Sequence, residues 1–118
     1  MRKAHAPHLA LIRAALSSIE RYRPADEAAF LAEPMAQDAI LMRLQEIGEN
    51  LARLRHIDED AFAEAASDSW IQLIGLRNVI SHGYHQIKPE TIWQIVVDEL
   101  PAFSQSLSAF DRWSDSIS

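Results

Sequence analysis

Residues 34–54, PMAQDAILMRLQEIGENLARL, show the clearest structural pattern in the chain. Apolar side chains recur in it at spacings of three and four residues, which is the period of one face of an α-helix. Pro34 suits a first helical turn, where an amide hydrogen has no intrahelical partner. The pattern predicts a long helix that buries one stripe, consisting of Ile40, Leu44, Ile47, Leu51 and Leu54.

The flanking segments continue the helical pattern. A first helix is predicted over about residues 7–22, and Pro24 ends it because proline cannot continue a helix. We expect the alanine-rich segment 25–32 to form a helical turn or two, and the segment 58–66 to be a connector or a short helix. The stripe of the first helix has the same spacing and consists of Leu9, Ile12, Leu16 and Ile19.

Two more helices are predicted in the second half of the chain. Ser67 or Asp68 can cap the first of them, and Gly83 is suited to the left-handed residue that closes it. The last helix is predicted over 89–110 from its apolar spacing. It should bend at Pro101, because proline removes the hydrogen bond to the carbonyl one turn earlier.

The chain shows little that is typical of β-structure. It has only three glycines, no hairpin dipeptides and no runs that alternate apolar and polar residues. We therefore predict an all-α fold, an antiparallel bundle of about four or five helices. A length of 118 residues with 48% hydrophobic content suits one domain, expected to span 1–118. In so small a chain, a site shared between two copies is a serious hypothesis.

The composition indicates in which cellular compartment the protein is expected. There is no cysteine, which excludes disulfides and thiolate metal sites and suits a reducing compartment, so we expect a cytoplasmic protein. No apolar run approaches the ~20 residues of a membrane helix. The basic start Met1-Arg2-Lys3 is followed by an amphipathic pattern containing Arg13, which is unlike a signal peptide.

The charge distribution is uneven. The net charge of −6 disfavours a nucleic-acid partner, because phosphate binding is mainly electrostatic. Residues 1–23 nevertheless hold five basic side chains against Glu20 alone, whereas residues 89–118 hold five acids against Arg112. Scattered solvated charges are the simpler interpretation of this asymmetry, and a localised basic surface is the alternative.

The segment Arg77-Asn78-Val79-Ile80-Ser81-His82-Gly83-Tyr84 carries the side chains with catalytic potential. Cleavage of RNA without a metal needs a base for the 2′-hydroxyl proton and a cation that stabilises the charge developing at phosphorus. His82 can serve as that base and, once protonated, as the acid for the leaving 5′-oxygen. Arg77 can clamp phosphate oxygens, and Tyr84 can stack on a base or hydrogen-bond a phosphate.

Spacing alone does not establish this function. Arg77 and His82 lie roughly 140° apart around a regular helix, so they do not share a face. Their convergence needs a helix end, the reach of the arginine side chain or a second subunit. Taken singly, Arg77 is typical of a surface salt bridge, His82 of a helix cap and Tyr84 of a packed ring.

The run Arg-Asn-x-x-x-His-x-Tyr at 77–84 resembles the signature of the HEPN superfamily, in particular of its HepT-like toxin branch. The similarity extends over nearly the whole chain, from about Leu9 to Phe110. Further segments that look like landmarks of that family are Ile47-Gly48-Glu49, Trp70, Ile74-Gly75-Leu76, Trp93 and Leu100-Pro101.

The resemblance implies a HEPN-like helical dimer whose two Arg-His pairs line a shared cleft. It implies a metal-independent endoribonuclease that leaves a 2′,3′-cyclic phosphate, with Arg77 and His82 catalytic, Asn78 and Tyr84 in support, and no cofactor. It also implies the toxin of a toxin–antitoxin system, restrained by a nucleotidyltransferase (MNT-type) antitoxin that attaches AMP to Tyr84. Bulk and negative charge there would block RNA phosphate.

Two other functions stay open, namely a non-catalytic nucleotide- or RNA-binding module and a purely structural helical dimer. Glu49 either supports the site or is a solvated helix glutamate, and the two tryptophans of the landmarks are expected in the core or an interface. Metal binding is not expected, because two histidine pairs spaced by three lack further ligands in a zinc pattern; these pairs are His5 with His8 and His82 with His85.

Overall fold

The computed structural model describes residues 2–83 and 86–116, and the surroundings of the side chains at 4–83 and 86–108. Every regular element in the described part is helical, which confirms the predicted all-α fold. The elements are α1 (Arg2–Tyr22), α2 (Glu27–Leu31), α3 (Pro34–Ile57), α4 (Glu59–Ala65), α5 (Asp68–Gly83), α6 (Pro89–Gln94), the π-helical turn η2 (Ile95–Glu99) and α7 (Leu100–Ser116).

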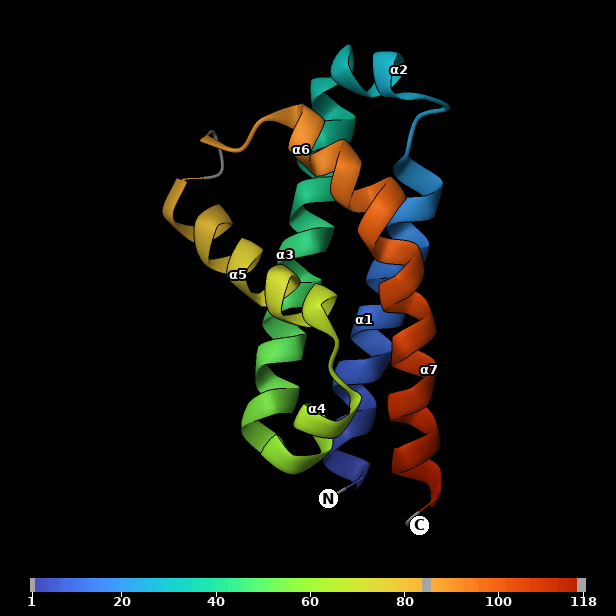
Figure 1. Cartoon of the computed structure of the whole chain (residues 1–118). Helices are drawn as coiled ribbons and strands as arrows, with labels where there is room; N and C mark the ends of the chain where they lie inside the picture. The colour runs from blue at the N-terminus through green and yellow to red at the C-terminus, as the bar shows by residue number, and fades with distance from the viewer. Residues whose placement is uncertain (1, 84–85, 117–118) are drawn as a thin grey trace.

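The long helices run alternately up and down (Figure 1). Helix α3 is central: α1 packs on one side of it and α5 on another, while α6, η2 and α7 form the remaining wall. The short helices α2 and α4 lie near opposite ends of the bundle, at the two ends of α3 (Figure 1). Among the described residues, none of the helices combines the length with the apolar character that a membrane span needs.

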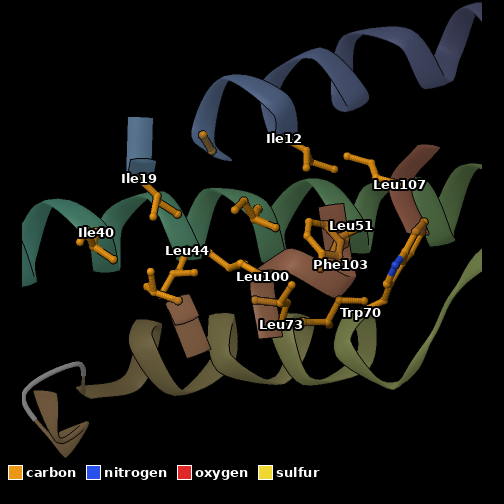
Figure 2. Close-up of a cluster of buried hydrophobic side chains, with 14 of the residues drawn as sticks. Ile12, Ile19, Ile40, Leu44, Leu51, Trp70, Leu73, Leu100, Phe103 and Leu107 are labelled. Carbon is orange, nitrogen blue, oxygen red and sulfur yellow. The ribbon is translucent and has the colours of Figure 1, made fainter. Parts of the chain in front are cut away.

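The core follows the predicted stripes. All five residues of the α3 stripe are fully buried, and they meet α1, α5 and α7 side chains in the cluster shown in Figure 2. Trp70 lies in the same cluster, and its indole Nε1 donates to Ser106 Oγ at 2.6 Å. Buried tryptophan normally requires such a partner for its N–H. Trp70 and Trp93 are thus both core residues.

The bend expected at Pro101 takes the form of a π-helical turn immediately before it. Pro101 has no amide hydrogen, so the preceding turn is freed from the regular register. The Leu100 N–H bonds to the Ile95 carbonyl, five residues back, as in a π-helix. The chain changes direction across η2, between α6 and α7 (Figure 1).

Candidate functional site

Gly48 brings α5 close against α3. A Cβ at this position would lie 2.5 Å from the Leu73 carbonyl oxygen and 2.8 Å from Arg77 Cβ, closer than real Cβ atoms approach. Only glycine therefore permits this crossing. The close crossing at Gly48 places Arg77 beside Glu49, the next residue of α3.

Two elements hold the Arg77 guanidinium. Its Nη1 donates to Glu49 Oε2 at 3.2 Å, and its Nε and Nη2 donate to Asn78 Oδ1 at 3.2 and 2.7 Å. Glu49 is itself shared, since its Oε1 lies 3.3 Å from Nη2 of Arg53. A guanidinium has five N–H donors in a rigid fork, so these bonds fix its plane and leave N–H groups for a phosphate oxygen.

The His82 ring is held in a defined protonation pattern. Its Nδ1 lies 2.8 Å from the Asn78 carbonyl oxygen, and the side chain is exposed. A carbonyl oxygen only accepts, so Nδ1 carries the hydrogen of this bond. In the neutral ring, Nε2 is then the atom with the free lone pair, and it is available as a proton acceptor.

Asn78 links the two predicted catalytic residues. Its side chain holds Arg77 and its backbone carbonyl holds His82. The Arg77 guanidinium and the His82 ring are thus both anchored on Asn78, although the two residues lie roughly 140° apart around a regular helix. Asn78, predicted from sequence to support the site, contacts both Arg77 and His82, and its supporting role stays a prediction.

Sequence reasoning missed Arg53. The signal that could have found it is the spacing of four between Glu49 and Arg53, which places an acid and a base on one helix face. The expected left-handed closure at Gly83 was wrong, since α5 continues through Gly83 and no glycine of the described part has a positive φ. Tyr84 lies outside the described residues.

The histidines His5 and His8 face different partners. Nε2 of the buried His5 lies 3.6 Å from Asp58 Oδ2, and Nδ1 of His8 lies 2.9 Å from Asn50 Oδ1. The His8 contact joins α1 to α3, and the His5 contact joins α1 to Asp58, the residue directly after α3. No group of three His, Cys, Asp or Glu side chains suited to a metal ion occurs among the described residues, and His85 is outside them.

Two basic residues of the N-terminal region, Arg21 and Arg23, have partners within that region and not at Arg77. Arg21 donates to Ser18. Arg23, the residue after α1, pairs with Glu20, and its guanidinium carbon lies 5.5 Å from the centroid of the Trp93 ring. Helix α1 lies across α3 from α5 (Figure 2). Among the described residues, the cations that the structure pairs with Glu49 are Arg77 and Arg53.

Comparisons with known proteins place this chain in a family. The family model described as Ribonuclease HepT-like matches residues 12–110. Putative RNase MJ1380 of Methanocaldococcus jannaschii is 27% identical over 97 residues, which cover 82% of this chain and 86% of that protein. Putative RNase MJ0127 of the same organism is 31% identical over 72 residues, 61% of this chain and 57% of that protein. No solved structure matches the chain. The chain belongs to the HepT-like ribonuclease family.

Proposed function

We propose that this protein is a metal-independent endoribonuclease and the toxin of a toxin–antitoxin system. The observation that carries the proposal is the arrangement around Asn78, which holds the Arg77 guanidinium and leaves His82 Nε2 as the proton acceptor. A general base and an oriented cation are the two groups that phosphodiester cleavage by an internal nucleophile requires.

The reaction proceeds by transfer of the 2′-hydroxyl proton to His82 Nε2 while O2′ attacks the adjacent phosphorus. Arg77 N–H groups stabilise the charge that develops on the phosphate oxygens. The bond from phosphorus to the 5′-oxygen breaks, and a protonated imidazole, from the same or a second copy, returns a proton to that oxygen. The products are a 2′,3′-cyclic phosphate and a 5′-hydroxyl.

The test is incubation of purified protein with RNA in EDTA, after mass spectrometry has shown that the protein carries no AMP. We expect cleavage, with cyclic phosphate and 5′-hydroxyl ends identified by mass spectrometry of the products. Intact RNA that is nevertheless bound would favour the non-catalytic binding module. Products with 5′-phosphate ends, or cleavage that requires a divalent ion, would contradict the proposed chemistry.

The proposal includes a homodimer, and the outer face of α5 is the surface that suits it. Ile71 and Val79 are 53% and 47% exposed, and Gly75 lies between them one turn from each. A Cβ at Gly75 would meet no atom of the described chain within 4 Å. Glycine inside a helix costs about 1 kcal/mol relative to alanine, and no contact within the described chain requires it here.

The scarcity of charged side chains on α5 also favours its outer face as the dimer interface. Between residues 69 and 81 the only charged side chain is Arg77, which is paired with Glu49. Two copies of a protein with net charge −6 repel each other least where the contacting faces carry no charge. A second α5 helix packed closely at Gly75 would bury Ile71 and Val79 of both copies.

Val79→Asp is expected to shift the protein from dimer to monomer, because it places an unpaired charge in the apolar contact. Leu11→Asp is the matched control: Leu11 on α1 is also 47% exposed and should tolerate the change. Light scattering after size-exclusion chromatography measures the mass of each variant. Equal behaviour of the two variants would refute α5 as the interface.

The proposed antitoxin is a nucleotidyltransferase that transfers AMP from ATP to the Tyr84 hydroxyl and releases pyrophosphate. The added phosphate would bring bulk and negative charge two residues from His82, which opposes the approach of RNA phosphate. We expect a nucleotidyltransferase encoded in the same operon to raise the mass of the protein by an AMP group and to abolish cleavage.

Tyr84→Phe should remain unmodified and cleave RNA in the presence of the nucleotidyltransferase and ATP. The other tyrosine of the chain, Tyr22, is 42% exposed on α1 and is the internal control for accessibility. Peptide mapping locates the AMP group. Attachment of AMP to Tyr22, or to the Tyr84→Phe variant, would contradict the assignment of Tyr84 as the modified residue.

A further inference from the structure

A cavity of about 350 Å³ lies between α3 and the second half of α5, and no step of the proposed reaction uses it. Its α3 wall is one helical face, because the contributing residues are spaced at three and four along the chain. The lining residues are Asp38, Leu41, Met42, Gln45 and Ile80.

The cavity adjoins the catalytic residues. Gln45 precedes Glu49 by one turn of α3, about 6 Å along the axis, and Glu49 holds Arg77. On the other wall, Gln45 Nε2 donates to Ser81 Oγ at 3.4 Å, and Ser81 is the residue before His82. A group attached to the nucleotide that Arg77 clamps is therefore within reach of the cavity.

The lining is suited to a flat ring with a polar edge. Leu41 and Ile80 are buried and form an apolar floor, while Met42 is 60% exposed and presents a polarisable thioether to an aromatic face. The polar groups are the Asp38 carboxylate and the Gln45 amide. None of the described lining residues is a lysine or arginine, so the cavity does not suit a phosphate.

We propose that this cavity binds a nucleobase of the RNA next to the scissile phosphate, and that the base is guanine. The inference rests on the proposed ribonuclease function. Guanine presents two adjacent N–H donors, N1–H and the 2-amino group, which match the two oxygens of the Asp38 carboxylate. Adenine and cytosine present an amine beside a ring nitrogen lone pair, and uracil presents one N–H between two carbonyls, so a carboxylate repels part of each edge.

The experiment measures binding separately from cleavage. Fluorescent RNA tetranucleotides that differ only in the base at one position are titrated into the His82→Ala protein, and the dissociation constants are compared. At one position next to the central phosphate we expect guanine to bind at least about fivefold more tightly than the other bases. Adding Asp38→Asn should abolish this preference.

Asp98→Asn is the matched control. Asp98 is also exposed and lines another groove, between α5 and the α6–η2 segment. It should leave the guanine preference unchanged, and circular dichroism verifies that both variants fold. Equal affinity for all four bases, no RNA binding, or a guanine preference that survives Asp38→Asn would each overturn the inference. Cleavage by the wild-type protein, measured in parallel, decides the proposed function independently.

Discussion

Replacing His82 by alanine is expected to slow RNA cleavage by about 10²- to 10⁴-fold, which is the usual contribution of a general acid–base group. The fold should be unaffected. His82 is exposed, and its hydrogen bond is to the Asn78 carbonyl, a backbone group already within α5. We expect the free energy of unfolding to change by less than about 0.5 kcal/mol, as for most surface substitutions.

The control for this loss is His56→Ala, which removes another exposed helical histidine, near the end of α3. Initial rates on a fluorescent RNA, with urea denaturation of each variant, give the two quantities to be compared. Full activity of His82→Ala would contradict the assignment of His82. So would an equal loss in His56→Ala, because it would point to a general effect on the helices or on RNA binding.

Gly48→Ala is expected to destabilise the protein by about 1–3 kcal/mol, the usual cost of overpacking a close contact. The added methyl would meet the Leu73 carbonyl oxygen at 2.5 Å, and a backbone atom cannot rotate away. Helix α5 must then shift outward from α3 and take Arg77 away from Glu49. We therefore expect a reduced cleavage rate even at temperatures where the variant is fully folded.

Gly75→Ala adds the same methyl group as Gly48→Ala but is expected to raise the stability of the protein rather than lower it. Its Cβ enters open space, and alanine is favoured over glycine in a helix by up to about 1 kcal/mol, so the monomer should become more stable. Urea denaturation of both variants at low protein concentration tests the contrast. Destabilisation of Gly75→Ala as large as that of Gly48→Ala would show that the α3–α5 contact is not the cause.

The helices and the core were largely predictable from sequence. The spacing of apolar residues in α3 is a local property, and the same spacing determines which of its faces is buried. The position of the turn before Pro101 was predictable, because proline has no amide hydrogen in any fold. Its π-helical form was not, since that depends on how η2 packs against the bundle.

The candidate site also has features that were predictable from sequence and features that were not. The fold class could be predicted from the sequence alone, and the run at 77–84 with its family resemblance identified the candidate residues Arg77, Asn78 and His82. The contact between Glu49 and the Arg77 guanidinium, 28 residues apart, became known from the folded structure, as did the close approach that Gly48 allows. The reason is physical: periodicity records which face of a helix is apolar, whereas the partner of that face is chosen by packing between segments distant in the chain.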